Sequence, residues 1–147
     1  MQTVKKSHGA YIFGDGKLRT GWTMRRGSIE VGSEQWTVEV TDRHRIGVIA
    51  KAGSAPVVRL HPQQTHVPGP GGPVHWAPSR RGGVLTRGAN RLTVQQSARS
   101  VRVEVTGSWA SLELVALTAC FAVMSRSRRR TLMIIAIVGA TGHGPIG

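Results

Sequence analysis

The chain has 147 residues, enough for one domain that buries a hydrophobic core without disulfides or metals. Hydrophobic residues make up 39% and charged residues 18%, which excludes a disordered polyelectrolyte, while 19 glycines and 7 prolines disfavour a helical bundle. Twenty basic residues face seven acidic ones, for a formal net charge of +13. This excess favours polyanionic partners, either nucleic acid or an anionic membrane face, although a GC-rich genome that favours arginine is an alternative explanation.

Apolar and polar residues alternate along much of the chain, which predicts short β-strands. The alternation is clear from Ile29 to Val31 and from Trp36 to Val40. Turn-forming residues follow at Asp42 to His44, and the alternation resumes from Ile46 to Ala50, a pattern typical of a β-hairpin. Further short strands are predicted at Val57–Leu60, Val84–Leu85, Leu92–Val94 and Val101–Val105. Because no helical pattern separates them, these strands favour an antiparallel barrel or sandwich.

Two segments depart from this regular pattern. Residues 1–21 are polar and rich in glycine, so we expect a flexible lead-in or a first strand there. Residues 61–81 contain a Gly-Pro-Gly-Gly-Pro run from Gly69 to Pro73 and predict a mobile loop. The β domain, with its core helix, is therefore expected over residues 22–124.

The C-terminal part of the domain predicts a helix. Leu112 to Met124 is apolar on every face except at Glu113 and Thr118, and Ser108 or Ser111 can cap its start. A helix that is apolar all round must be buried. The predicted fold is therefore mainly β, an antiparallel barrel or sandwich of short strands packed on a C-terminal hydrophobic helix.

Residues 125–147 are expected to form a basic hinge and an apolar tail. The four arginines between Ser125 and Arg130 suit the negative end of the helix dipole and are expected to end the helix, and Thr131 to Val138 is a second apolar run. A membrane core is about 30 Å thick, more than either run can cross alone. One helix through both runs would place the arginines near mid-bilayer, at about 2.5 to 3.5 kcal/mol each. Spanning is therefore disfavoured, whereas lying on the membrane surface is not.

A glycine-rich turn from Ile137 to Gly144 resembles the start of a dinucleotide-binding motif. The helix that must follow such a turn is missing, so we expect no bound cofactor. Cys120 falls in the most apolar part of the predicted helix, where a thiol stays protonated and acts as a small hydrophobic group. One cysteine forms no internal disulfide, and residues 1–16 hold no apolar run typical of a signal peptide, so we expect a cytoplasmic protein, or one peripheral at the inner membrane face.

Three histidines, His61, His66 and His75, lie in the predicted loop. Their spacing matches no standard zinc pattern, and the stretch from Ser54 to Val103 holds no Cys, Asp or Glu as a further ligand. Solvated loop histidines are the simpler interpretation, and we expect no metal. The same lack of carboxylates disfavours acid/base catalysis, so an enzyme is the class of protein that the sequence supports least.

Trp22 and Trp76 each precede a pair of arginines by a few residues, whereas Trp36 belongs to a strand face and is predicted to be core. A tryptophan beside basic residues suits a membrane interface or a phosphate-facing surface. The simpler alternative is ordinary packing beside solvated arginines. The candidate lipid- or polyanion-binding residues are Arg25, Arg26, Arg80, Arg81, Arg126, Arg128, Arg129 and Arg130.

The segment Trp36-Thr37-Val38-Glu39-Val40-Thr41-Asp42-Arg43-His44-Arg45-Ile46-Gly47-Val48 is a strand, an Asp-containing turn and a strand. With the later apolar helix, it resembles the tubby-like barrel shared by LURP-one-related proteins and phospholipid scramblases. The resemblance covers about Trp22 to Met124 and implies an antiparallel barrel that encloses the helix. The acidic loop that calcium ligation in scramblases needs is absent from this chain, so no functional residue of those families is carried over.

These observations predict a non-enzymatic binding module that associates with anionic lipid surfaces. One alternative is a basic protein that binds nucleic acid through the same charge. Another is a structural or peripheral membrane protein that assembles through its C-terminal apolar segments. The sequence leaves the oligomeric state open.

Overall fold

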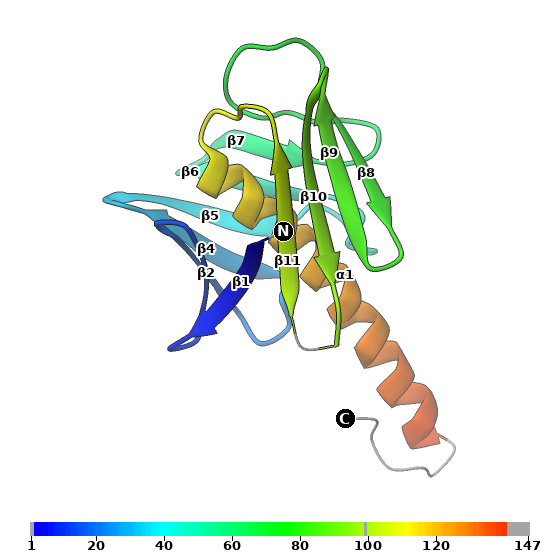
Figure 1. Ribbon diagram of the computed structural model, residues 1–147. Coiled ribbons are helices and arrows are strands. Elements are labelled where there is room, and N and C mark those ends of the chain that lie inside the picture. The colour runs from blue at the N-terminus through cyan, green and yellow to red at the C-terminus, as the bar shows by residue number, and fades with distance from the viewer. Residues whose placement is uncertain (1, 99, 141–147) are drawn as a thin grey trace.

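The computed structural model describes residues 2–98 and 100–140, with side chains described as far as Ser127. The described chain folds into strands and one long helix (Figure 1). The strands are β1 (Gln2–Ser7), β2 (Ala10–Phe13), β3 (Gly16–Thr20), β4 (Arg26–Val31), β5 (Glu34–Val40), β6 (Val48–Ala52), β7 (Ala55–Leu60), β8 (His75–Ser79), β9 (Gly82–Arg87), β10 (Asn90–Gln96) and β11 (Val101–Thr106), and the helix is α1 (Leu112–Ala140).

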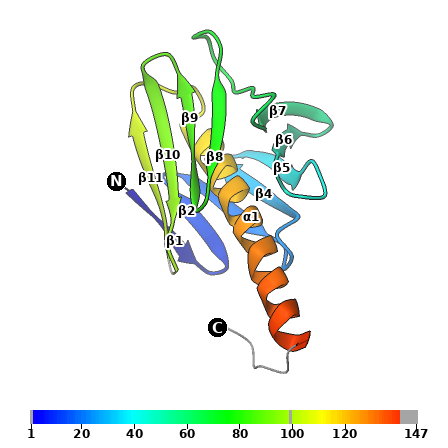
Figure 2. The same cartoon turned by 90° about the vertical axis from the view of Figure 1, so that its right-hand side faces the viewer.

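The strands form one antiparallel sheet of 11 strands in the order β7-β6-β5-β4-β3-β2-β1-β11-β10-β9-β8. Neighbours in the chain pair with each other, and β1 also pairs with β11, so the two ends of the strand series meet in the middle of the sheet. The edge strands are β7 and β8, which follow one another in the chain, and Arg59 of β7 forms a bridge with His66 in the connecting segment. The sheet curls around α1 into a nearly closed barrel (Figures 1 and 2), which confirms the mainly β prediction.

A flexible lead-in or a first strand was expected over residues 1–21, and residues 2–20 contain more strands than that expectation named. They form β1, β2 and β3, and Val4, Phe13 and Leu18 point into the core. Val4 pairs with Val101 of β11, so this segment joins the two halves of the sheet. The strands escaped prediction because they are short and are separated by glycine turns, which leaves too few alternating positions to detect.

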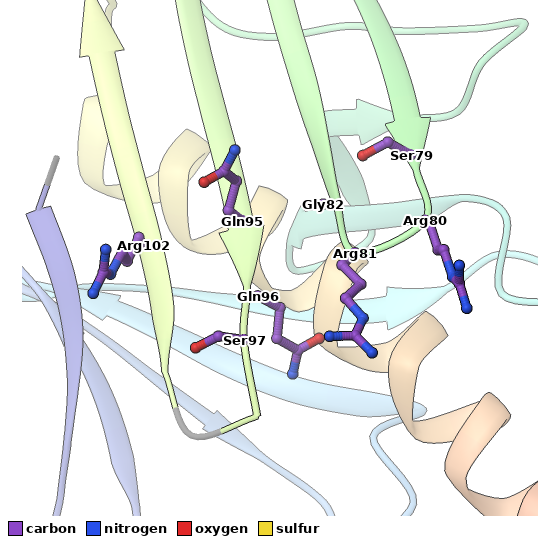
Figure 3. A pocket seen from close by; sticks show the side chains of 8 residues that line it. All are labelled: Ser79, Arg80, Arg81, Gly82, Gln95, Gln96, Ser97 and Arg102. Carbon is purple, nitrogen blue, oxygen red and sulfur yellow. The ribbon is translucent and has the colours of Figure 1, made fainter.

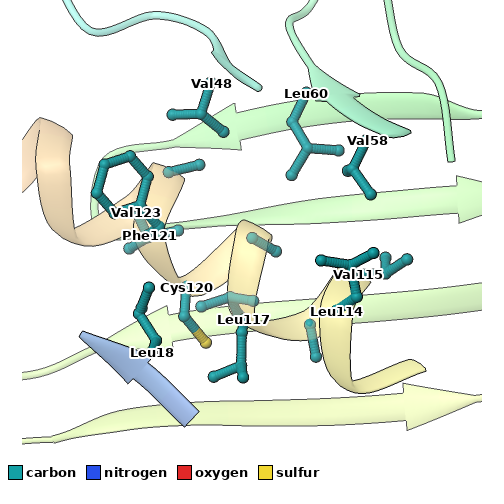
Figure 4. Packing of buried hydrophobic residues seen from close by; sticks show 14 of the residues in the cluster. Leu18, Val48, Val58, Leu60, Leu114, Val115, Leu117, Cys120, Phe121 and Val123 are labelled. Carbon is teal, nitrogen blue, oxygen red and sulfur yellow. The ribbon is translucent and has the colours of Figure 1, made fainter. Parts of the chain in front are cut away.

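The first half of α1 fills the barrel. Every side chain from Leu114 to Met124 is buried, and inward-facing strand residues such as Leu18, Val58 and Leu60 surround them (Figure 4). Burying an apolar side chain of this size contributes about 1.5 to 3 kcal/mol. The polar Thr118 is accommodated because its hydroxyl donates to the carbonyl oxygen of Leu114 at 2.7 Å. The predicted buried helix over Leu112 to Met124 is confirmed.

The helix was expected to end within the arginine-rich segment, but it continues to Ala140. Figures 1 and 2 show this second half projecting beyond the barrel. Arginine is a good helix former, and the chain has no glycine or proline between Met124 and Gly139 to stop the helix. Residues 126–140 add about 22 Å of helix. Within the described residues, no helix has both the length and the apolar character needed to cross a membrane.

The segment expected to be a mobile loop, residues 61–81, contains β8 and is organised by the buried Arg87 of β9. The Arg87 guanidinium donates to the carbonyl oxygen of Gly72 at 3.1 Å and to that of Gly69 at 3.2 Å. It also reaches the carbonyl oxygens of Val67, Pro68 and Pro70. A single cation thus satisfies five backbone carbonyls of a segment whose prolines and glycines form few backbone hydrogen bonds.

Candidate functional site

Two arginines form hydrogen bonds that connect several turns to α1 at the point where the helix leaves the barrel. Arg45 is buried, and its Nη1 atom donates to the carbonyl oxygens of Thr23 at 2.8 Å and Ser125 at 3.0 Å. This guanidinium therefore links the β3–β4 turn, the β5–β6 turn and α1.

On another side of the helix, the Nη2 atom of Arg126 donates to the carbonyl oxygens of Ser79 at 2.8 Å and Gly82 at 2.7 Å. These bonds attach α1 to the β8–β9 turn. The β10–β11 turn lies next to it, because the Gln96 amide donates to the carbonyl oxygen of Arg81 at 2.7 Å. We call this part of the molecule the exit end, formed by residues 21–25, 41–47, 79–82, 96–98 and 100 and by α1 at Ser125 and Arg126.

The β5–β6 turn is held by Asp42. Its carboxylate accepts hydrogen bonds from the backbone amides of His44 at 3.1 Å, Ile46 at 2.9 Å and Gly47 at 3.0 Å. Burial acts to raise the pKa of Asp42, but these three donors and the nearby His61 outweigh it and lower the pKa. The charge of Asp42 is therefore engaged within the turn, and the turn presents Arg43 and Ile46 to solvent.

Basic residues dominate the exit end. Its turns expose Arg25, Arg43, His44, Arg80 and Arg81, and Asp42 supplies the one carboxylate among the described residues of these turns. The other acidic residues lie on the barrel wall or toward the opposite end. Glu30 and Glu39 face Arg19 and Lys51 on the wall, Asp15 and Glu113 lie at the start of α1, and Glu34 lies at the β4–β5 turn. The carboxylates of the barrel therefore lie mostly away from the exit end.

The exit end also carries exposed apolar side chains. Trp22 in the β3–β4 turn is 78% exposed and Ile46 in the β5–β6 turn is 42% exposed, and these are the large hydrophobic residues that the described part of the chain leaves exposed. Both turns are linked to α1 through Arg45. Large apolar side chains that protrude together among cations are characteristic of interaction surfaces.

The predicted site residues are only partly brought together. Arg25, Arg80, Arg81 and Arg126 lie at the exit end, while the Nε atom of Arg26 lies 3.7 Å from a carboxylate oxygen of Glu39, so that charge is partly compensated. Arg128, Arg129 and Arg130 belong to α1 just beyond the barrel, but they lie outside the residues whose side chains are described.

Trp76 was considered for an interfacial surface, and this interpretation is wrong. Its side chain is 0% exposed and packs inside the barrel against Gly83, where even a Cβ atom would collide with the indole ring. The nearby Arg80 and Arg81 form the β8–β9 turn and are exposed, whereas Trp76 lies on the core face of β8. Proximity to arginines in the sequence was therefore misleading for Trp76, whereas Trp22 is exposed on the same turn as Arg25.

A surface pocket of about 480 Å³ lies beside the β8–β9 turn (Figure 3). Arg80 and Arg81 line it from the turn, and Arg102 lines it from β11, opposite Gln95 of β10. Sequence reasoning missed Arg102 because it is one of several polar residues on the outer face of a strand. Its pairing with Gln95 becomes apparent only when the strand register is known.

No group of three or more metal-ligating side chains occurs among the described residues. His61 lies beside the β5–β6 turn, and its Nδ1 atom accepts from the backbone amide of Gln63 at 3.0 Å. Cys120 lies inside the barrel, where burial raises the pKa of its thiol from 9.0 to about 12. The glycine-rich turn from residue 137 to 144 falls largely outside the described residues.

We expect Cys120 to resist thiol reagents in the native protein at pH near 8, because the thiol is both buried and protonated. With a chromogenic disulfide reagent, the reaction should follow global unfolding and reach one thiol per chain in denaturant. The free energy of unfolding should also fall as pH rises from 9.0 toward about 12, since the unfolded thiol ionises first. Rapid stoichiometric labelling under native conditions would contradict this prediction.

No protein-family model, curated protein or solved structure matches the chain. What the exit end can bind must therefore be argued from its charge, its exposed apolar side chains and its shape.

Proposed function

We propose that the chain is a non-enzymatic binding module that docks on anionic lipid surfaces through its exit end. The observation that carries this proposal is that Trp22 and Ile46, the exposed large hydrophobic side chains, lie on turns at the same end as the exposed arginines. An anionic bilayer attracts each nearby cation by about 1 kcal/mol, and tryptophan is favoured at the interface between headgroups and acyl chains. The exposed arginines and the exposed apolar side chains thus both favour an anionic lipid surface as the partner.

The course of α1 supports this orientation. The helix leaves the barrel at the exit end, and its projecting part carries arginines at 128–130 and then the apolar run Thr131 to Val138. Cations followed by an apolar segment suit the order of headgroups and acyl chains in a membrane interface. Docking in this orientation leaves the opposite end of the barrel, which carries Asp15, Glu34 and Glu113, facing water.

We further propose that the fold is of the tubby-like type. A nearly closed antiparallel barrel around a C-terminal hydrophobic helix agrees with that architecture. This assignment concerns the fold alone, because fold by itself does not establish what a protein binds.

Vesicle flotation tests the proposal. We expect the protein to float with phosphatidylcholine vesicles that contain phosphatidylserine and to stay behind with phosphatidylcholine alone, and we expect added salt to weaken the association. A gel shift with DNA and RNA over the same salt range should run in parallel. Binding to nucleic acid without binding to either vesicle would replace this proposal with the nucleic-acid alternative. Concentration-dependent self-association without either partner would favour assembly through the C-terminal segment.

Trp22 provides a direct probe of insertion. Because this side chain is 78% exposed in the free protein, its fluorescence should shift to shorter wavelength when it enters the vesicle interface. Trp22→Phe should abolish the shift, whereas Trp36→Phe should preserve it. An unchanged spectrum on vesicles that demonstrably bind the protein would show that the β3–β4 turn is not the contact.

A further inference from the structure

The pocket beside the β8–β9 turn has the character of an anion site. Arg80, Arg81 and Arg102 line it, and no carboxylate is among its lining residues. The carbonyl oxygens of Ser79 and Gly82, which would otherwise repel an anion, accept hydrogen bonds from Arg126. Both the charge and the local dipoles therefore favour a negatively charged group here.

The shape of the pocket suits a phosphate that carries a polar substituent. Gly82 lets the backbone of β10 approach the turn closely, because a Cβ atom there would collide with the carbonyl oxygen of Val94. The Gln95 and Gln96 amides and the Ser97 hydroxyl offer neutral hydrogen-bonding groups. In Figure 3, Arg81 and Gln96 lie together at the turn, and Arg80 and Arg102 lie on either side of them, Arg102 on the strand that pairs with Gln95. A volume of about 480 Å³ exceeds the needs of one phosphate and falls in the range of small-molecule sites.

We propose that this pocket binds a phosphate monoester, supplied either as a lipid headgroup or as a free small molecule, and in the lipid case this inference rests on the proposed function. A monoester presents three free oxygens, and its second ionisation near pH 6 makes it a dianion at neutral pH. Guanidinium groups bind such oxygens in pairs. A phosphodiester presents two free oxygens and one charge, so we expect it to form fewer and weaker hydrogen bonds with the three arginines.

Binding of two vesicle types at equal surface charge tests the inference, one containing phosphatidic acid and the other phosphatidylglycerol. We expect about five- to ten-fold tighter binding to phosphatidic acid, with a smaller preference when pH falls from about 7.5 to about 5.5 and the monoester loses its second charge. Arg81→Gln with Arg102→Gln should remove the preference. Arg91→Gln, an exposed arginine of β10 near the opposite end of the barrel, should retain it.

Glycerol 3-phosphate identifies the source of the phosphate. We expect titration with this soluble monoester to perturb the amide resonances of residues 79–82 and 95–97 in the wild type and not in the double variant. Perturbation without binding to any vesicle would support the pocket and overturn the proposed function. Equal binding to both vesicle types, with no response to glycerol 3-phosphate, would overturn the pocket and leave the proposed function standing. The thermal midpoint of each variant should be measured to show that the variant remains folded. The single variant Arg102→Gln provides a milder change if the double variant unfolds.

Discussion

Ala119→Asp should prevent the chain from folding. Ala119 is 0% exposed and lies in the part of α1 enclosed by the barrel, so a carboxylate there would be removed from water. An unpaired buried charge costs several kcal/mol, against a total stability of about 5 to 15 kcal/mol for a typical domain. The expected result is aggregated or unfolded protein without a cooperative thermal transition by circular dichroism.

Ala89→Asp is the matched control, because Ala89 is exposed in the β9–β10 turn and receives the same new charge. This variant should unfold cooperatively within a few degrees of the wild type. If Ala119→Asp also unfolded cooperatively near the wild-type midpoint, the helix could not be enclosed as described, and the barrel arrangement around it would be wrong.

Replacing Arg25, Arg43 and Arg80 by glutamine should weaken binding to anionic vesicles by about two orders of magnitude at low salt, since each cation near such a surface contributes about 1 kcal/mol. The three residues are exposed on three different turns of the exit end. Arg45 and Arg126 are left unchanged because they hydrogen-bond to backbone carbonyls and support the fold. Partition should be measured by flotation at several salt concentrations, together with the thermal midpoint.

The control replaces Lys17, Arg19 and Arg91, which are exposed elsewhere on the barrel, and it removes the same net charge. If the long-range field of the whole protein drove binding, both triple variants would weaken equally. If the exit end is the contact, the control should bind much as the wild type does. An equal loss of vesicle binding in both variants would therefore refute docking through the exit end, although the net positive charge of the protein would still drive binding.

The strands and the core helix were largely predictable because their signals are local. Alternation along Trp36–Val40 and Ile46–Ala50 reflects strands with one face in the core, and the all-round apolar character of Leu112–Met124 reflects burial on every side. The arginine-rich segment misled the prediction of where the helix ends. Arginine is favoured at helix C-termini, but it is also a good helix former within a helix. Only the absence of a glycine or proline that would end the helix shows that it continues here.

The candidate site was less predictable because it depends on topology. In an up-and-down sheet, alternate turns lie at the same end, so the turns after β3 and β5 share the exit end. The segment from His61 to Val74 then crosses to the opposite end, where Arg87 holds part of it, and this crossing returns the β8–β9 turn to the exit end. The positions of the basic residues in the sequence do not show which turns lie at the same end, or that the segment from His61 to Val74 crosses to the opposite end of the barrel.

The fold class, the buried helix and the excess of positive charge were predictable from the amino-acid sequence, because each depends on residue type or on periodicity within one segment. That Arg25, Arg43, Arg80 and Arg81 share one end with Trp22 and Ile46 follows only from the three-dimensional fold. The fold also places Trp76 in the core, although this residue lies near the Arg80-Arg81 pair in the chain. Which charges act together is a matter of distance in space, and barrel closure around α1 sets those distances.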